Sequence, residues 1–270
     1  MSTPFRFVIL AGGQGTRLTL FPGLHKALVP LQNRPAISHI LQNVPEDVEV
    51  IVSLGNLAEQ IRSYLAYVYP DRKITCVPDD TTKGQPGPAM GLRSCQSLLS
   101  GPFVFTSVDT ILGPGILHAA PTETWLGVDK LKAVTYACAS AKLGLTRIEV
   151  PPIFIGIAGV ANPEDFFQRL GSAAEVTEGF HDYQLKQLPW TDVGADATYL
   201  AACGQSTVPL KKDQVTFIDN GRVVKFFADP ERAARVAKRG DQFVKGTTQI
   251  NELMVGYLYV EGLPYSELGD

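Results

Sequence analysis

The feature that most constrains this chain is a glycine-rich segment that directly follows a short apolar run near the N-terminus. The run covers residues 5–10, and the segment from residue 10 to residue 18 reads Leu-Ala-Gly-Gly-Gln-Gly-Thr-Arg-Leu. A partly β-branched apolar run that ends in glycines predicts a buried strand leaving a sheet for a loop. Glycines spaced this closely let the backbone approach a ligand and aim several N–H groups at an anion. The segment therefore predicts a phosphate-binding loop, with a plain strand-to-helix turn as the alternative.

Downstream of this segment, short apolar runs alternate with stretches of helical spacing. The alternation predicts an α/β fold, a mostly parallel Rossmann-like sheet with helices on both faces. Ligands bind such sheets at the carboxyl ends of the strands, where the glycine segment and Asp109 both fall. We expect strands at residues 5–10, 48–54, 73–77, 103–108, 133–139 and 153–160, and helices near residues 37–43, 61–68 and 90–99.

The pattern changes after about residue 204. An Asn-Gly pair at residue 220 lies between two apolar runs, which is a strong hairpin signal. An Asp-Pro pair at residue 229 predicts the N-cap and first residue of a helix. We therefore divide the chain into a large domain over residues 1–204 and a small α+β appendage, a hairpin-helix segment, over residues 205–270.

Composition excludes several classes of protein. A net charge of −3 gives no basic field for nucleic acid, so we expect no nucleic-acid partner. The 4 cysteines include no C-x-x-C pair, which argues against a disulfide framework and a thiolate zinc site. The first apolar run is too short for a signal peptide or a membrane span. We expect a cytoplasmic protein with reduced thiols and no membrane partner.

Two common phosphate-binding patterns fail on spacing. A P-loop needs a lysine after the last glycine, and none follows Gly15. A dinucleotide fingerprint needs a glycine at the position of Leu18. Instead Arg17 and Lys26 bring two cations to the loop, which suits phosphoryl transfer, where positioning and charge neutralisation dominate catalysis.

The segment 10–18, together with Lys26-Ala-Leu-Val-Pro30, resembles the L-A-G-G-x-G-T-R-L and P-K-x-L-x-P signature of sugar-phosphate nucleotidyltransferases. The resemblance runs from about residue 5 to residue 204. One departure is His25, where the family usually has proline, and we expect it to alter loop stiffness more than chemistry. The resemblance implies catalytic roles for Arg17, Lys26 and Asp109. It also implies nucleotide-binding roles for Leu10, Ala11, Gly12, Gly13, Gly15, Thr16, Gln85 and Gly87.

Three further segments carry the resemblance. Gln85-Pro-Gly-Pro-Ala-Met-Gly91 is similar to the family's base-reading segment, although Pro88 replaces a threonine. Trp190-Thr-Asp-Val-Gly194 is similar to the segment whose aspartate, here Asp192, joins Asp109 in binding Mg²⁺. Residues 175–180 look like the acceptor-side loop, which implies acceptor contacts from Glu178 and Gly179, with a solvated loop as the alternative.

The acceptor phosphate has no clear partner in the sequence. Where the family has a Glu-Lys-Pro segment, residues 146–152 place no lysine after Glu149, and Arg147 or Lys142 is left as a substitute. We therefore expect an enzyme that transfers a nucleoside monophosphate from an NTP to a small phosphorylated acceptor and releases pyrophosphate. A sugar 1-phosphate is the first candidate acceptor, and phosphocholine is the alternative.

Two other functions fit the sequence less well. A silent nucleotide-binding regulatory module would keep the glycines and lose the metal carboxylates, yet both carboxylates are present. A dinucleotide-dependent oxidoreductase is disfavoured by Leu18. The sequence leaves the base, the acceptor and the oligomeric state open.

The C-terminal segment carries a second, shorter resemblance. Val223-Val-Lys-Phe-Phe227 is similar to the strand that bears the ATP-binding lysine of kinases, and residues 257–262 to the hinge of choline- and aminoglycoside-kinase-like enzymes. We expect the first part of a kinase-like domain, cut off at residue 270, that transfers no phosphate by itself and makes few contacts with the surroundings of Gly12 and Asp109. An ordinary hairpin and helix packed on the large domain is the alternative.

Overall fold

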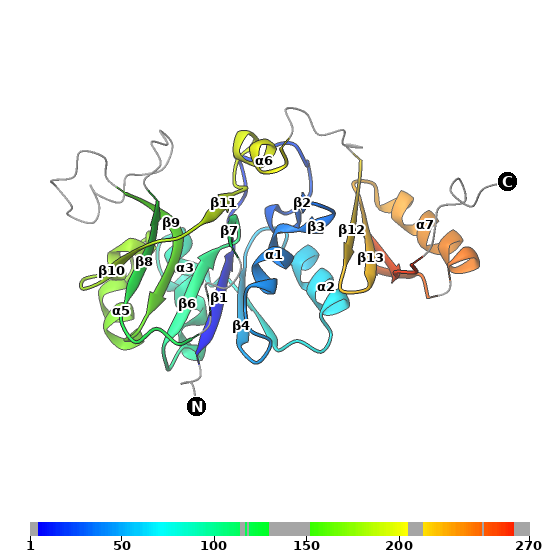
Figure 1. Ribbon diagram of the computed structural model, residues 1–270. Helices are drawn as coiled ribbons and strands as arrows, with labels where there is room; N and C mark the ends of the chain where they lie inside the picture. The colour runs from blue at the N-terminus through cyan, green and yellow to red at the C-terminus, as the bar shows by residue number, and fades with distance from the viewer. Residues whose placement is uncertain are drawn as a thin grey trace.

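The computed structural model describes residues 5–113, 117, 119–129, 152–204, 213–244 and 246–261. These residues form a large α/β domain and a smaller sheet-and-helix unit that lies beside it, next to helix α2 (Figure 1). Among the segments expected from the sequence, the strand at 133–139 and the acceptor-phosphate region before residue 152 lie outside the described residues.

The large domain is built on a seven-stranded sheet with the order β10-β8-β9-β6-β1-β4-β5. Strand β9 pairs antiparallel with β6 and β8, and the other neighbours in this sheet pair parallel. The expected mostly parallel sheet is confirmed. Its strands are β1 (Arg6–Ala11), β4 (Glu49–Leu54), β5 (Ile74–Pro78), β6 (Phe103–Ser107), β8 (Trp125–Asp129), β9 (Ile153–Val160) and β10 (Gln184–Gln187).

Helices cover both faces of this sheet. The side chains of β1 alternate between two apolar clusters: Phe7 and Ile9 belong to one, Val8 and Leu10 to the other. The first cluster includes side chains of α1 and α2, and the second those of α3 and α5, so the strand is buried on both faces, as its unbroken apolar run requires. The helices are α1 (Ala36–Gln42), α2 (Ala58–Val68), α3 (Pro88–Cys95), α5 (Pro163–Leu170) and α6 (Asp196–Ala202).

Short elements connect the main ones and shape the edge of the sheet where the loops gather. Two small antiparallel pairs are formed by β2 with β3 and by β7 with β11. The expected helix at 90–99 starts earlier, at Pro88, and ends in a 3-10 turn. The short elements are β2 (Pro30–Leu31), β3 (Arg34–Pro35), β7 (Thr110–Leu112), β11 (Trp190–Asp192), η1 (Lys26–Leu28), η2 (Thr81–Lys83), η3 (Gln96–Leu98) and η4 (Val176–Gly179).

The C-terminal unit is a four-stranded antiparallel sheet with the order β12-β13-β15-β14 and one helix. Asn220 and Gly221 connect its first two strands with φ angles of 46° and 68°, as the hairpin turn predicted from the sequence requires. The Asp229 side chain accepts from the backbone N–H of Glu231 and caps the helix. Both expected elements are confirmed. The unit contains β12 (Gln214–Asp219), β13 (Arg222–Phe227), α7 (Pro230–Phe243), β14 (Thr248–Asn251) and β15 (Met254–Leu258).

This unit packs against α2 and the β2–β3 hairpin. Phe217 of β12 lies edge-on to the ring of Tyr64 in α2, with 5.9 Å between ring centroids, and both belong to the same apolar cluster. Backbone contact also occurs, because the N–H of Ile218 donates to the carbonyl of Asn33 at 2.8 Å. Lys225 lies 5.5 Å from the ring centroid of Tyr257. The unit is therefore docked on the large domain at a place other than the glycine loop.

Two smaller expectations concern membranes and thiols. Within the described part of the chain, no helix is long and apolar enough to cross a membrane. Of the cysteines, Cys76, Cys95 and Cys203 are free thiols, and Cys138 falls in a segment the structure does not describe.

Candidate active site

The glycine segment forms a tight loop at the carboxyl end of β1. Gly15 has a φ of 68°, a conformation that favours glycine, and its carbonyl accepts from the N–H of Leu18 at 3.1 Å. A β-carbon on Gly12 would stand 1.8 Å from Oδ2 of Asp79, and one on Gly13 would stand 3.4 Å from Nζ of Lys26. Two charged side chains of opposite sign therefore lie against consecutive glycines of the loop.

Lys26 and Asp109 form an ion pair beside this loop. The ammonium donates to Oδ2 of Asp109 at 3.0 Å, and the two side chains are only 15% and 13% exposed. Burial alone would raise the pKa of Asp109, but the charge and hydrogen bond of Lys26, with the charge of Arg17, hold it below its usual range. Asp109 is therefore an anion throughout the physiological pH range.

His25 fixes the segment that carries Lys26. Its Nδ1 accepts from the N–H of Ala27 at 3.0 Å, its own N–H donates to Oε1 of Gln60 at 2.9 Å, and it is 2% exposed. Burial and the charge of Lys26 lower the pKa of His25 from 6.5 to about 4, so the imidazole is neutral at pH 7. The residue that replaces the expected proline is therefore a buried cap of η1.

Asp192, the second predicted metal ligand, lies near Asp109, the first, on either side of Gly194. Asp192 lies on β11, which pairs with β7 directly after Asp109, and the N–H of Val193 donates to the carbonyl of Asp109 at 3.1 Å. A β-carbon on Gly194 would stand 2.7 Å from Oδ2 of Asp109 and 3.1 Å from Oδ1 of Asp192. The structure thus brings both carboxylates to the same glycine. Two carboxylates with substrate phosphates are a usual ligand set for Mg²⁺, so the residues fit this ion.

A cavity of about 670 Å³ opens along the glycine loop and holds several of the predicted residues. This volume suits a nucleotide-sized ligand. Of the residues predicted from the sequence, those in its lining are Leu10, Gly12, Gly13, Arg17, Lys26, Gly87 and Asp109. Those outside its lining are Ala11, Gly15, Thr16, Gln85, Glu178, Gly179 and Asp192.

Gln85 does not present its side chain in the lining of this cavity. Its backbone N–H donates to the carbonyl of Ser172 at 3.3 Å, and its carbonyl accepts from the guanidinium of Arg93 at 3.3 Å. Gly87 does line the cavity, and a β-carbon there would stand 2.4 Å from the carbonyl oxygen of Ala174. The role predicted for the Gln85 side chain in reading the base stays a prediction.

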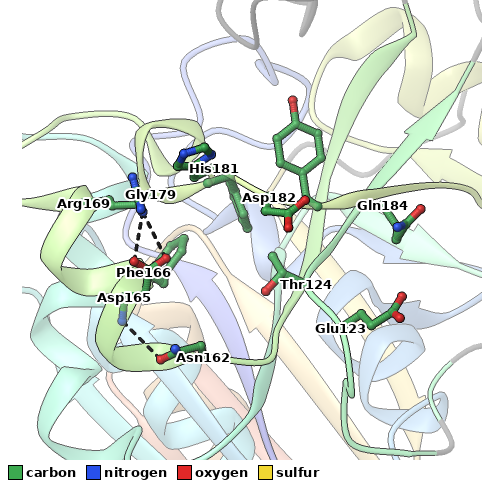
Figure 2. A pocket seen from close by; sticks show the side chains of 12 residues that line it. Glu123, Thr124, Asn162, Asp165, Phe166, Arg169, Gly179, His181, Asp182 and Gln184 are labelled. Carbon is green, nitrogen blue, oxygen red and sulfur yellow. Dashed lines mark hydrogen bonds and ion pairs between the residues drawn. The ribbon is translucent and has the colours of Figure 1, made fainter.

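Glu178 and Gly179, predicted to contact the acceptor, lie in η4. Glu178 is exposed, and Gly179 is buried against the ring of Phe166 and faces a second cavity, of about 550 Å³ (Figure 2). Their neighbours Glu175 and Thr177 line the cavity of the glycine loop instead. The acceptor roles of Glu178 and Gly179 stay predictions.

The second cavity is poorly suited to a triphosphate. Among the described residues that line it, Arg169 is the one cation of the Lys and Arg type, and it donates to both carboxylate oxygens of Asp165 at 3.0 Å. Glu123 and Asp182 add further negative charge to the same lining (Figure 2). The cavity of the glycine loop, whose lining includes Arg17 and Lys26, is therefore the better candidate for a nucleotide site.

Residues 7–130 match the family profile of the MobA-like NTP transferase domain. The match supports a nucleotidyltransferase family. Curated relatives agree: the bifunctional protein GlmU of Sphingopyxis alaskensis is 34% identical over 68 residues, 24% of this chain and 15% of that protein. GlmU of Methanococcus vannielii is 27% identical over 126 residues, 46% of this chain and 29% of that protein. The chain thus spans less than a third of these relatives.

Solved nucleotidyltransferase structures share the fold. The CTP:phosphocholine cytidylyltransferase of Streptococcus pneumoniae superposes with a TM-score of 0.58 over 75% of this chain and 99% of that chain, at 17% identity. A UDP-glucose pyrophosphorylase bound to UDP-glucose superposes with a TM-score of 0.56 over 75% of this chain and 98% of that chain, at 12% identity. The inositol-1-phosphate CTP transferase of T. maritima superposes with a TM-score of 0.55 over 76% of this chain and 97% of that chain, at 12% identity. The nucleotidyltransferase fold expected from the sequence is therefore confirmed.

Asp79 and Ser53 are two residues of the cavity lining that were not predicted from the sequence. Asp79 follows β5 and Ser53 lies near the end of β4, so the strand-end argument that singled out Asp109 applies to both. Asp196, outside the cavity lining, was not predicted either: its carboxylate accepts from the N–H groups of Thr19 and Leu20 at 2.7 and 3.2 Å and anchors the residues that follow the glycine segment. It stands only two residues beyond the Trp-x-Asp-x-Gly segment.

Proposed function

We propose that this chain transfers a nucleoside monophosphate from an NTP to a small phosphorylated acceptor. The observation that carries the proposal is the buried ion pair of Lys26 and Asp109, placed against the glycine loop inside a nucleotide-sized cavity. In this reaction an oxygen of the acceptor phosphate attacks the α-phosphorus. The bond breaks between the α-phosphorus and the oxygen that joins it to the β-phosphorus, and pyrophosphate leaves with the electron pair.

The two cations have complementary positions for this chemistry. Lys26 is held by Asp109 and by the buried η1 turn, so its charge is preorganised where phosphoryl oxygens would approach the loop. Arg17 is an exposed side chain in the cavity lining and is free to follow the triphosphate. A charge fixed before the reaction stabilises the transition state more effectively than one that must reorganise. We assign the transferring phosphoryl group to Lys26 and the leaving pyrophosphate to Arg17.

Asp109 and Asp192 would hold Mg²⁺. When bound, the ion supplies Lewis-acid stabilisation of charge on the phosphoryl oxygens. The support for this assignment is the position of both carboxylates against Gly194, from segments 83 residues apart in the sequence.

A sugar 1-phosphate is the acceptor we propose first, with phosphocholine as the alternative. Among the structures that share the fold, one is named as a putative glucose-1-phosphate thymidylyltransferase and another as a phosphocholine cytidylyltransferase. Glu175 and Thr177 line the cavity beside the predicted acceptor loop and can accept from sugar hydroxyls. Glu175 could equally attract the quaternary ammonium of choline.

A coupled assay of pyrophosphate release tests this function. Each common NTP is combined with Mg²⁺ and a panel of sugar 1-phosphates and phosphocholine. We expect release with at least one pair and none when the acceptor is left out. Nucleotide binding without release from any pair would favour the regulatory alternative.

For the C-terminal unit we propose a kinase-like nucleotide-binding sheet that transfers no phosphate by itself. The support is its antiparallel order, with Lys225 on β13 and α7 directly after that strand. Lys225 and Tyr257 lie together on neighbouring strands. An ATP titration of the wild type and of Lys225→Ala, in the presence of an NTP that saturates the other site, tests the assignment. Equal ATP binding by both proteins would contradict it.

A further inference from the structure

Helix α6 holds the residues that follow the glycine loop. Its first residue, Asp196, donates its backbone N–H to the carbonyl of Arg17 at 3.2 Å. The Asp196 carboxylate accepts from the N–H and the hydroxyl of Thr19 at 2.7 and 2.5 Å, and from the N–H of Leu20 at 3.2 Å. One residue of α6 therefore holds residues 17–20, although 177 positions separate it from Thr19.

Both oxygens of this carboxylate are used by protein donors. Oδ1 accepts from the two backbone N–H groups, and Oδ2 accepts from the hydroxyl of Thr19. Burial alone would raise the pKa of Asp196, but the hydrogen bonds from Thr19 and Leu20 hold it below its usual range. Asp196 also lies outside the cavity lining. Its carboxylate therefore serves the neighbouring segment and not a ligand in the cavity.

The glycine loop is anchored on both sides. Before the loop, β1 is fixed by its backbone pairing with β4 and β6. Within the loop the glycines give the backbone wide freedom, and Gly15 adopts a φ of 68°. After the loop, Asp196 holds the carbonyl of Arg17, whose side chain is exposed and lines the cavity. The backbone of Arg17 is thus fixed while its guanidinium can still move.

The same helix holds the far end of this segment. The hydroxyl of Tyr199 donates to the carbonyl of Pro30 at 2.5 Å, and its ring lies edge-on to that of Phe21, with 5.3 Å between centroids. Lys26 lies between these two contacts in the chain. Because α6 follows β11, which carries Asp192, the helix joins the segment of the two cations to the segment of a predicted metal ligand (Figure 1).

We propose that Asp196 is a positioning residue that holds Arg17 where the leaving pyrophosphate forms. The inference rests on the proposed function and gives Asp196 no contact with substrate. Stabilisation of a transition state depends on groups that are in place before the reaction, and small displacements of such groups lower the rate steeply. Loss of the Asp196 side chain should therefore reduce what Arg17 contributes.

Two substitutions at this position separate hydrogen bonding from charge. Asp196→Ala removes every side-chain acceptor, whereas Asp196→Asn keeps one oxygen for both N–H groups and offers an amide donor to the hydroxyl of Thr19. We expect Asp196→Ala to lower kcat/KM for the NTP by about three- to thirtyfold and to leave the KM of the acceptor unchanged. We expect Asp196→Asn to retain most of the wild-type value.

Asp229→Ala is the matched control. The Asp229 carboxylate also accepts from a backbone N–H, that of Glu231 at 2.9 Å, but it does so in the C-terminal unit, and its loss should leave the kinetics unchanged. Thermal melts establish that each variant folds. If Asp196→Ala does not fold, Thr19→Val takes its place, because it removes the hydroxyl donor from the other side of the contact and should give a smaller loss in the same direction.

A double-mutant cycle tests whether Asp196 acts through Arg17. In the Arg17→Ala background, Asp196→Ala should cause no further loss, because no guanidinium is left to position. The cycle is measured as kcat/KM for the NTP and, separately, as the affinity for inorganic pyrophosphate with Mg²⁺ by titration calorimetry. The second measurement requires no turnover, so it tests the positioning role even if no pair of NTP and acceptor supports the reaction.

Three outcomes would overturn the proposal. Additive losses in the cycle would make Asp196 a residue of general structural importance. Equal losses for Asp196→Ala and Asp196→Asn would assign the effect to the charge of the carboxylate. Wild-type kcat/KM and pyrophosphate affinity in Asp196→Ala would show that Arg17 needs no anchor. A failed release screen with a non-additive pyrophosphate cycle would reject the proposed function and retain the positioning role, whereas a wild type that binds no pyrophosphate would overturn both.

Discussion

Lys26 donates a hydrogen bond to Asp109 across 3.0 Å, although the two residues are 83 positions apart in the chain. Lys26 arrives on η1 after the glycine segment, and Asp109 arrives at the end of β6, which pairs directly with β1. The pair therefore links two segments of the predicted catalytic site through neighbouring strands. Because both side chains are largely buried, the loss of one charge changes the electrostatics of the whole cavity.

Asp109→Asn should lower the turnover of pyrophosphate release by at least about a hundredfold, because the change removes a charged ligand of the proposed metal ion. The shape of the side chain is retained, so the melting temperature should change little. Asp165→Asn, in the second cavity, is the control and should keep wild-type turnover. Turnover of Asp109→Asn within a factor of about two of wild type would contradict the metal assignment.

Arg17→Ala should reduce kcat/KM by about ten- to a thousandfold through lost stabilisation of charge in the transition state. Its side chain is exposed, so stability should be unaffected. Arg62→Ala removes an arginine that pairs with Glu59 at the surface and should leave the kinetics unchanged. If Arg17→Ala and Arg62→Ala have equal kcat/KM, Arg17 is an ordinary surface residue.

Gly194→Ala should impair catalysis by displacing two carboxylates at once. The added methyl group would stand 2.7 Å from the carboxylate of Asp109 and 3.1 Å from that of Asp192, so both must move. We expect lower turnover and a higher Mg²⁺ concentration for half-maximal activity. Gly101→Ala, whose β-carbon meets nothing within 4 Å, is the control. A variant at Gly194 with an unchanged Mg²⁺ titration would show that the two carboxylates do not share an ion.

Most helices and strands, and the two cations Arg17 and Lys26, were predictable because each has a local signal in the sequence. The buried strand at residues 6–11, the Asn220 hairpin and the strand-end aspartate all follow from patterns of a few residues. The antiparallel direction of β9 was not predictable, because an eight-residue apolar run has the same pattern whichever way the strand runs in the sheet. Asp79 was missed because its meaning comes from Gly12, 67 positions earlier, and only the fold brings the two together.

His25 should make folding stability dependent on pH in mildly acidic solution. Its pKa is about 4 in the folded chain against 6.5 when unfolded, so the unfolded state binds more protons between these values. Stability from this group is complete above pH 6.5 and is lost as pH falls toward 4, by about 3 kcal/mol in total. His25→Asn keeps a capping acceptor and has no group that titrates. Denaturant unfolding between pH 4 and 7 should therefore show a smaller slope with pH in the variant, and equal slopes would refute the assignment.

The last prediction concerns Asp219, which joins the C-terminal unit to the large domain. Its buried carboxylate accepts from the hydroxyls of Tyr64 at 2.9 Å and Tyr69 at 2.5 Å, and it pairs with the guanidinium of Arg34 at 2.8 Å. Asp219→Ala leaves these partners without their acceptor and should cost about 3 kcal/mol of stability. Asp213→Ala removes an exposed ion pair with Arg232 and should cost less than about 1 kcal/mol.

Both tryptophans of the chain, Trp125 and Trp190, lie in the large domain, so their fluorescence reports its unfolding and leaves the C-terminal unit unseen. Because Phe217 and Tyr64 share one apolar cluster, loss of the Asp219 contacts should lower the denaturant midpoint seen by tryptophan. Proteolysis within residues 213–261 should accelerate in parallel. Faster proteolysis with an unchanged tryptophan midpoint would instead show that the C-terminal unit folds and unfolds independently. In that case, deletion of the unit should spare pyrophosphate release.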